Sequence, residues 1–435
     1  MNKNEIIQIL HDWNFWEHPI EAGFERSHYL SQLKNFLTTP QVIAITGPRR
    51  SGKSFLMRRM AQTLLTQGVP KNHILMVNLE DPRFTQLNTK LLDQIYSVYL
   101  EFLAPQGPSY LFLDEIQEID QWEKWVRYLN ELKKAKMIVS GSNAKLLSRE
   151  LGTLLTGRHL DLTVFPLSFK EYLQFNGLPF SSWPILKEEQ FAIQGHLRRY
   201  IEFGGFPEVV LSEPKKEILL GYFDDIVNKD LLKRFKIRKS EKLKSLVKYY
   251  LSNIAALSTF NSMEKFLQIS ADTVEKFSNY LEQVYLIFFL KRFSFKVKEQ
   301  EKSPRKVYSI DTGLSHMLGF RFSENRGKLL ENIVFLELKR RLLADPSLQL
   351  YYWKDLKHRE VDFVINQGPA VKTLIQVCLR LDDLMTKDRE IKSLLKGMEE
   401  LQPAEALVIT EDLESQETIE GKQIQFVPLG KWLLT

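Results

Sequence analysis

The sequence has very little cysteine and no long apolar segment. Cys378 is the only cysteine among 435 residues, which excludes an intramolecular disulfide framework and a cysteine-rich zinc site. No apolar run approaches the ~20 residues that a membrane-spanning helix needs. The N-terminal segment also lacks the basic and then apolar build of a secretory signal. We therefore expect a cytoplasmic protein with no membrane partner.

The chain also lacks internal repeats, low-complexity tracts and a strong charge of one sign. The absence of repeats argues against a solenoid, and a net charge of +6 does not by itself indicate a nucleic-acid binder. Residues 229–248 and 290–308 nevertheless concentrate Lys and Arg. Two interpretations of these stretches stay open: DNA binding, or a solvated helix face and a hairpin edge guarded by lysines.

What the sequence does contain is a regular alternation of short apolar runs with helical patterns. In the first half, apolar positions at three-to-four spacing over 54–68 and 88–103 predict helices. The runs that predict buried strands are residues 41–46, 74–79, 110–114, 136–140 and 161–165. Such alternation is typical of an α/β fold whose parallel sheet is covered on both faces.

From residue 166 the pattern becomes helical, and the length of the chain predicts two to four domains. Three short helical patterns are followed by two strand patterns, which is the order of a winged helix. The predicted parts are a helical lead-in, a parallel-sheet α/β core, a helical lid or connector, a winged helix and a compact α/β domain, at residues 1–40, 41–165, 166–238, 239–316 and 317–435.

A phosphate-binding loop lies between the first predicted strand and the helix after it. Its residues, in the pattern G-x-x-x-x-G-K-S, are Gly47, Pro48, Arg49, Arg50, Ser51, Gly52, Lys53 and Ser54. Glycines let the backbone wrap around phosphate oxygens, and the N–H groups of the loop and helix bind the anion. We expect ATP here, with Lys53 at the β- and γ-phosphates and Ser54 as a ligand of Mg²⁺.

The strand pattern at 110–114 ends in two adjacent acids. Asp114 is predicted to hold Mg²⁺ through water, and Glu115 to act as the general base on the attacking water. Capping of the next helix is the alternative role. Buried strands seldom end in two carboxylates, because burying an unpaired charge is costly. The pair therefore favours hydrolysis of ATP to ADP and phosphate over a site that only binds the nucleotide.

Polar residues also follow the strand pattern at 136–140. Asn143 is predicted to contact the γ-phosphate or the water, with capping of the following helix as the alternative. Arg149 and Arg158 are candidates for stabilising the transferred phosphate, in cis or from a neighbouring subunit, and Arg158 is preferred.

The segments GPRRSGKS, YLFLDEIQ, VSGSN and LTGR occur in this order with short spacings. They resemble the AAA-type, archaeal-ATPase-like P-loop proteins of prokaryotes. Five further segments are similar to the C-terminal domain of unknown function in that family: residues 203–210, 228–237, 306–314, 329–341 and 360–378. The resemblance implies an ATP-binding protein, a homo-oligomer, and a C-terminal unit that descends from a restriction-endonuclease-like fold.

An active nuclease of that fold needs an acid on one strand and Glu-x-Lys on the next. Asp362 fills the first position and Glu331 on the preceding helix could assist, but Gln376 and Cys378 stand at the other two. The centre thus lacks both the negative charge of one metal ligand, the glutamate, and the positive charge of the lysine. We expect an inactive relic, retained for binding nucleic acid or a protein partner, unless Lys354 or Lys372 supplies the cation.

The leading hypothesis is an ATPase whose nucleotide state drives a conformational change in the winged-helix and nuclease-like parts. DNA binding is a separate prediction, which rests on the winged-helix order and the basic stretches. One alternative is a nucleotide-gated binding or signalling module with negligible turnover. Another is a magnesium-dependent nuclease regulated by ATP.

Overall fold

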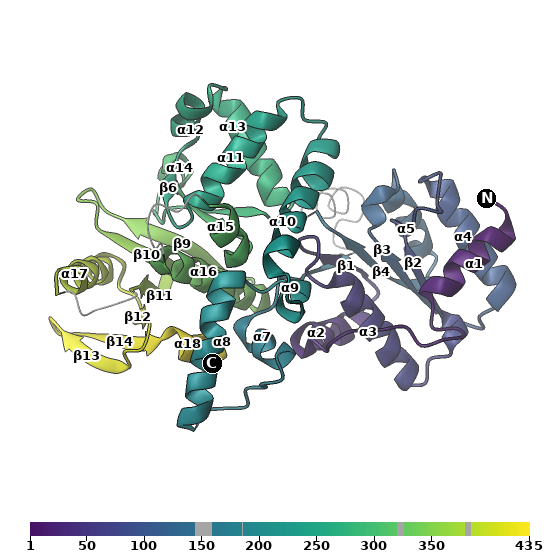
Figure 1. Ribbon diagram of the computed structural model, residues 1–435, viewed down its shortest axis with the longest axis horizontal. Helices are drawn as coiled ribbons and strands as arrows, with labels where there is room; N and C mark the ends of the chain where they lie inside the picture. Colours follow the sequence, from purple (N-terminus) through teal and green to yellow (C-terminus); the bar gives the residue numbers. More distant parts are fainter. Residues whose placement is uncertain (144–158, 185, 320–325, 379–383) are drawn as a thin grey trace. The chain divides into compact units, whose positions relative to one another are not determined.

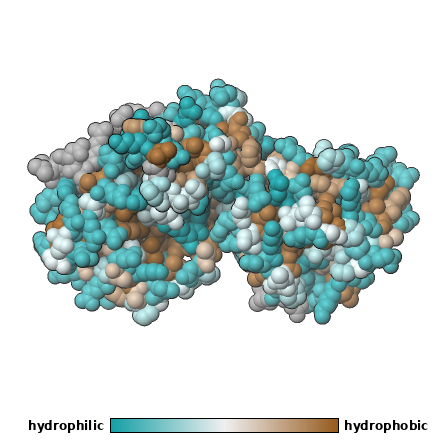
Figure 2. All heavy atoms as spheres, turned by 90° about the horizontal axis from the view of Figure 1, so that it is seen from below, coloured by the Kyte–Doolittle hydropathy of each residue, from teal (hydrophilic) through white to brown (hydrophobic). Residues whose placement is uncertain are grey.

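The computed structural model describes residues 1–143, 159–184, 186–319, 326–378 and 384–435 (Figure 1). The chain divides into two compact units. The first comprises Met1–Val164 with the short segment Gln283–Tyr285, and the second comprises Phe165–Glu282 with Leu286–Thr435. Among the described residues, no helix is both long and apolar enough to span a membrane. The face shown in Figure 2 is mostly hydrophilic, with hydrophobic side chains in separate groups.

The first unit is built on one parallel sheet of five strands, in the order β2-β3-β4-β1-β5. The strands are β1 (Val42–Thr46), β2 (Ile74–Asn78), β3 (Ser109–Asp114), β4 (Ala135–Gly141) and β5 (His159–Thr163). The predicted α/β class with a parallel sheet is confirmed. Because β1 lies between β4 and β5, the loop that follows it emerges from the interior of the sheet.

Helices cover both faces of this sheet because side chains alternate along each strand. Val42 and Ala44 face the cluster that contains the apolar sides of α1 (Lys3–Trp13), α4 (Thr89–Leu103) and α5 (Trp122–Glu131). Ile43 and Ile45 face the opposite cluster, which contains those of α2 (Ser27–Leu37) and α3 (Lys53–Thr66). Short 3₁₀ turns, η1 (Lys71–His73) and η2 (Ile116–Glu118), precede β2 and follow β3.

The second unit begins with helices. They are α7 (Phe169–Phe175), α8 (Lys187–Phe203), α9 (Pro207–Leu211), α10 (Lys215–Asp225) and the π-helical segment η3 (Ile226–Lys233). Three more helices follow, α11 (Ser240–Ser252), α12 (Phe260–Leu267) and α13 (Ala271–Gln283). They accompany an antiparallel three-stranded sheet in the order β6-β8-β7, made of β6 (Leu257–Ser258), β7 (Ile287–Leu290) and β8 (Arg305–Ser309).

Two short helices that the sequence analysis did not predict flank strand β8. Helix α14 (Val297–Lys302) lies between β7 and β8, and α15 (Thr312–Leu318) follows β8. The second of the two strand patterns predicted for the winged helix covers residues 306–313. In the structure it is a strand that ends at Ser309 and a helix that begins at Thr312. The Asp311 side chain accepts hydrogen bonds from the first turn of α15, so the aspartate ends the strand by capping the helix.

The C-terminal part is a mixed six-stranded sheet in the order β13-β14-β12-β11-β10-β9. Its elements are α16 (Arg326–Ala344), β9 (Leu348–Lys354), β10 (Glu360–Gln367), β11 (Ala370–Val377), α17 (Leu384–Leu401), β12 (Glu405–Thr410), β13 (Ser415–Ile419), β14 (Lys422–Pro428) and α18 (Leu429–Leu434). β9, β10 and β11 form an antiparallel meander, whereas β11, β12 and β14 are parallel. α17 packs against β10 and β11 and connects β11 to its parallel neighbour β12, as a parallel pair requires.

Asp311 is a buried link between the end of α8 and the start of α15. Its carboxylate accepts hydrogen bonds from the backbone N–H of Gly205 at 2.7 Å and of Gly313 at 2.9 Å. Burial raises the pKa of Asp311 to about 6, against the lowering effect of these hydrogen bonds. The folded protein therefore binds a proton at Asp311 more tightly than the unfolded chain does.

This pKa shift predicts a pH dependence with a definite sign. Stability that Asp311 contributes below its ordinary pKa of 3.8 is lost as the pH rises through about 6, a loss of up to about 3 kcal/mol. We expect the free energy of unfolding of the wild type, minus that of Asp311→Asn, to fall by this amount between pH 4 and pH 7. Urea titrations at four pH values measure it, and a difference that stays constant with pH would contradict the prediction.

Candidate functional site

The order of the strands brings three predicted segments to one edge of the first sheet. Strand β4 lies between β1 and β3, and all three are parallel. The phosphate-binding loop, the two acids and the residues after β4 all follow the carboxyl ends of these strands. They therefore meet at the edge where open parallel sheets bind ligands.

The loop at 47–54 has a backbone shape that favours glycine. Gly47 and Gly52 have φ angles of 139° and 96°, and Arg50 between them has 69°. A Cβ atom on Gly47 would lie 2.2 Å from the carbonyl oxygen of Val164. Gly52 is the N-cap of α3 and forms no side-chain cap hydrogen bond. The first N–H groups of a helix have no partner within the helix, so this end of α3 can bind an anion.

The close approach at Gly47 predicts a large effect of a single methyl group. Gly47→Ala should lower the free energy of unfolding by at least about 2 kcal/mol, because both φ and the Val164 carbonyl oppose a side chain. Gly68→Ala is the matched control, since Gly68 has φ +93° but no heavy atom within 4 Å of the added Cβ. The control should lose only about 1 kcal/mol, and urea denaturation compares the two. Equal losses would mean that the contact with Val164 is harmless.

Lys53 is enclosed by the loop. Its side chain is 4% exposed, and its ammonium donates to the carbonyl oxygens of Gly47 at 3.2 Å and Pro48 at 3.0 Å. The same nitrogen lies 3.6 Å from Oε1 of Glu115. Hydrogen bonds to phosphate oxygens are stronger than these bonds to neutral carbonyls. The ammonium is thus held where an incoming phosphate could replace its present acceptors.

Asp114 contacts two hydroxyl groups at the end of β3. The Ser140 hydroxyl donates to Oδ1 of Asp114, and Ser54 also forms a side-chain hydrogen bond with this carboxylate. Burial and the neighbouring charge of Glu115 raise the pKa of Asp114 above its ordinary value. Ser54 and Asp114, which were predicted from separate motifs to hold Mg²⁺, are therefore in direct contact. A hydroxyl and a carboxylate are oxygen donors that fit this hard cation.

Glu115 follows at a left-handed backbone position, with φ 52°. Its backbone N–H donates to the Ser140 hydroxyl at 3.1 Å, and Gln117 donates through Nε2 to Oε2 of the Glu115 carboxylate at 2.5 Å. Ser140 thus orients both acids, and Gln117 orients the carboxylate of Glu115. Neither role was predicted. The role of Ser140 depends on the pairing of β3 with β4, and the role of Gln117 has no signature in the sequence.

The remaining predicted residues of this site occupy varied positions. Asn143 is 1% exposed and lies two residues beyond β4, and its contact with phosphate or water stays a prediction. Arg49 pairs with Glu80 at 2.9 Å. Arg149 and Arg158 lie outside the described residues. Arg26, which was not predicted to belong to the site, is buried and donates a hydrogen bond to the carbonyl oxygen of Ser51 in the loop at 3.0 Å.

The second predicted set lies in the C-terminal sheet, where three of its four members come together. Asp362 on β10 accepts from the backbone N–H of Val377 at 2.9 Å, and its own N–H donates to Oε1 of Gln376 at 3.3 Å. Asp362 and Glu331 share a hydrogen-bonding partner, Lys306. Cys378 instead belongs to an apolar cluster of the sheet.

The cation at these carboxylates comes from neither lysine that was considered. Lys372 is exposed, and Lys354 pairs with Glu360 at 3.0 Å. Lys306 of β8 lies among the acids. Although burial favours the neutral amine, the carboxylates of Asp362 and Glu331 hold the pKa of Lys306 well above its ordinary value.

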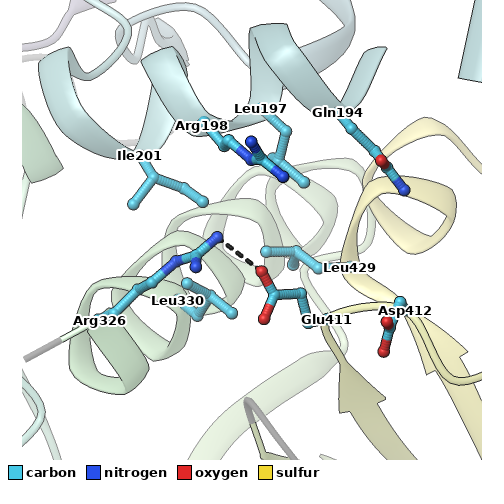
Figure 3. A pocket seen from close by; sticks show the side chains of 9 residues that line it. All are labelled: Gln194, Leu197, Arg198, Ile201, Arg326, Leu330, Glu411, Asp412 and Leu429. Atoms are coloured by element: carbon cyan, nitrogen blue, oxygen red, sulfur yellow. Dashed lines mark ion pairs between the residues drawn. The ribbon is translucent and has the colours of Figure 1, made fainter. Parts of the chain in front are cut away.

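A separate pocket lies among α8, the start of α16 and the loop after β12 (Figure 3). Its volume is about 120 Å³, and an ion pair between Arg326 and Glu411, at 2.7 Å, crosses it. Its lining is Gln194, Leu197, Arg198, Ile201, Arg326, Leu330, Glu411, Asp412 and Leu429. None of the predicted site residues is among them.

Comparisons with known proteins match a domain that contains the loop at 47–54. Family comparison finds an AAA domain at residues 39–173, followed by two domains of unknown function, DUF8612 at 194–325 and DUF4143 at 326–432. The uncharacterized protein MJ1544 of Methanocaldococcus jannaschii is 34% identical over 409 residues, which cover 91% of this chain and 88% of the relative. The chain belongs to this family of AAA-domain proteins.

A second relative extends the match over nearly the whole length of both chains. An uncharacterized protein of Haemophilus influenzae is 31% identical over 422 residues, 95% of this chain and 99% of the relative. Among solved structures, the Walker-type ATPase PABY2304 of Pyrococcus abyssi is similar over 68% of this chain and 96% of its own, with 14% identity and a TM-score of 0.44. The predicted AAA-type P-loop domain with C-terminal domains of unknown function is confirmed.

Proposed function

We propose that this AAA-domain protein binds ATP with Mg²⁺ at residues 47–54 and hydrolyses it to ADP and phosphate. The observation that carries the proposal is the convergence of Lys53, the Ser54–Asp114 pair and Glu115 at one end of the sheet. A relic that only bound nucleotide would need the loop and Lys53. It would have no use for a second, oriented carboxylate beside the ammonium.

Each group has a defined task in this proposal. The loop backbone and the start of α3 bind the phosphates, and Lys53 exchanges the carbonyls of Gly47 and Pro48 for β- and γ-phosphate oxygens. Ser54 and Asp114 would hold the magnesium, which neutralises phosphate charge when bound. Glu115, oriented by Gln117, takes the proton of the attacking water. Asn143 and Arg158 are the proposed contacts to the transferred phosphate.

The test is release of phosphate by the purified full-length protein with ATP and Mg²⁺. Sustained release that stops with EDTA supports hydrolysis. A tightly bound ATP whose γ-phosphate stays intact through a single-turnover assay would show a nucleotide-gated module instead. Particle mass, recorded with and without ATP, examines the homo-oligomer that the family suggests.

We interpret α11–α13 with β6–β8 as a winged helix, and the acidic character of its third helix favours a protein contact over DNA. The third helix, α13, carries Asp272, Glu275 and Glu282 against one lysine, Lys276. In the segment between β7 and β8, which would be the wing, Lys291 pairs with Glu301 at 2.5 Å. The basic stretch at 290–308 is therefore partly neutralised in place. A DNA complex that weakens steeply with salt, with or without ATP, would overturn this interpretation.

A further inference from the structure

The ammonium group of Lys306 is surrounded by three carboxylates. Its Nζ lies 2.7 Å from Oδ1 of Asp362, 2.8 Å from Oε1 of Glu360 and 2.9 Å from Oε1 of Glu331. The Lys306 side chain is 1% exposed. An ammonium has three N–H donors and no acceptor, so these contacts use its whole bonding capacity. Lys306 is thus a buried cation at the centre of an acidic cluster.

The acids of this cluster include both carboxylates that the sequence analysis assigned to a metal centre. Asp362 and Glu360 lie on β10, and Glu331 lies on α16. Three oxygens from such positions are the donor set that Mg²⁺, Mn²⁺ or Ca²⁺ would take. Yet among the residues that the structure describes, no group of three or more His, Cys, Asp or Glu residues is arranged to hold a metal ion. Lys306 stands where that ion would stand.

The carboxylate oxygens have further partners within the protein. Oδ2 of Asp362 accepts from the Val377 N–H at 2.9 Å, and Oε2 of Glu360 accepts from Lys354 at 3.0 Å. Oε1 of Glu331 also accepts from the Tyr308 hydroxyl at 2.7 Å. To bind here, a divalent cation would have to displace the buried Lys306 ammonium and disrupt these hydrogen bonds of the carboxylates. The cluster is satisfied without a metal.

We propose that the Lys306 ammonium replaces a divalent metal ion in the nuclease-like centre. The cation site there is occupied by a lysine of the protein itself, which excludes a metal ion. Without a cation, the buried carboxylate of Asp362 and the partly buried carboxylates of Glu331 and Glu360 would repel one another at a high cost in free energy. Where an active nuclease has the glutamate and lysine of Glu-x-Lys, this chain has the uncharged residues Gln376 and Cys378. Lys306 supplies a cation from strand β8 instead. Gln376 belongs to the same network, since its Oε1 accepts from the Asp362 N–H at 3.3 Å, and its Nε2 donates to Glu390 at 2.6 Å.

The strand that carries Lys306 is also held by contacts that do not involve the ammonium. Asn332 of α16 pairs with the backbone of Ser309 through two hydrogen bonds, of 2.8 and 3.0 Å. The ring of Tyr308 stacks on Phe335, with centroids 4.1 Å apart. A variant at Lys306 should therefore keep β8 against α16, which makes the proposal testable in the folded protein.

The experiment measures Mn²⁺ binding to the full-length protein by titration calorimetry and electron paramagnetic resonance. A Ser54→Ala background removes a proposed magnesium ligand of the ATP site. In this background we expect no Mn²⁺ at the cluster while Lys306 is present. Lys306→Gln should gain one site per chain, with a Kd of about 10⁻⁴–10⁻³ M, and adding Asp362→Asn should abolish it. Lys306→Gln removes the charge and retains a polar side chain, one atom shorter, with two N–H donors. Circular dichroism verifies the fold.

Lys354→Met is the matched control, because it removes the other lysine that pairs with Glu360 and leaves Lys306 in place. It should gain no Mn²⁺ site. Mn²⁺ that binds the background protein and is lost on Asp362→Asn alone would overturn the proposal, since the centre would then hold a metal beside Lys306. A folded Lys306→Gln protein that binds no Mn²⁺ would overturn it as well. Neither outcome depends on whether the protein hydrolyses ATP.

Discussion

Glu115→Gln is expected to lower multiple-turnover hydrolysis of ATP by at least about 10²-fold, while ATP still binds with nearly the affinity of the wild type. An amide of the same shape cannot accept the proton of the attacking water, and a positioned general base contributes roughly 10²–10⁴-fold. The carboxylate is well placed for this role. It is held by Gln117 and lies 3.6 Å from the Lys53 ammonium, which itself lies at the proposed phosphate site.

The measurement combines a steady-state phosphate assay with calorimetric titration of a slowly hydrolysed ATP analogue. Glu123→Gln makes the same chemical change in the first turn of α5 and should retain full activity. If Glu115→Gln turned over ATP at the rate of this control, Glu115 would not be the base.

The layout of the first unit could be predicted because its strands are buried on both faces. Strands of that kind are continuous apolar runs, and those at β1, β2, β3 and β4 were predicted to within one or two residues. The fifth was displaced, since the prediction of 161–165 included the apolar residues Val164 and Phe165, whereas β5 ends at Thr163. These two side chains are buried beyond the end of the strand.

Short elements of the second unit were missed for a different reason. β6 has two residues, and β13 at the sheet edge reads Ser-Gln-Glu-Thr-Ile, with too few apolar positions for a clear strand pattern. Such pieces form because a neighbouring strand offers hydrogen-bonding partners. α14 has no buried residue, so its sequence carries no apolar stripe that could have predicted a helix.

In the candidate sites, the motifs that are contiguous in the sequence could be predicted, whereas contacts between residues far apart in the sequence could not. The loop at 47–54 and the pair Asp114–Glu115 are contiguous, so their chemistry could be predicted from the sequence. The Ser140 hydroxyl meets Asp114 across 26 positions, and Lys306 meets Asp362 across 56. Contacts of this kind depend on strand order and register. The sequence could show that Gln376 and Cys378 lack a charge and a cation, but not which lysine replaces the cation.

Lys53→Ala is expected to produce the opposite pattern to Glu115→Gln, with loss of nucleotide binding as well as turnover. The Lys53 ammonium lies inside the loop, 3.0 Å from the Pro48 carbonyl, and its charge is proposed to serve the β- and γ-phosphates. Charged hydrogen bonds contribute about 1.5–3 kcal/mol each, so ATP affinity should fall by roughly 10²-fold or more. Because the γ-phosphate is absent from ADP, ADP affinity should fall less.

Lys71→Ala in η1 is the control for Lys53→Ala, since it removes an exposed lysine of the same unit and should leave both affinities unchanged. Titration calorimetry with ATP and ADP provides the comparison. The loss at Lys53 could instead arise indirectly, through a displaced Glu115, its partner at 3.6 Å. In that case Glu115→Gln would weaken ATP binding as strongly as Lys53→Ala does. Retained binding in one variant and lost binding in the other would assign phosphate binding to the lysine and water activation to the glutamate.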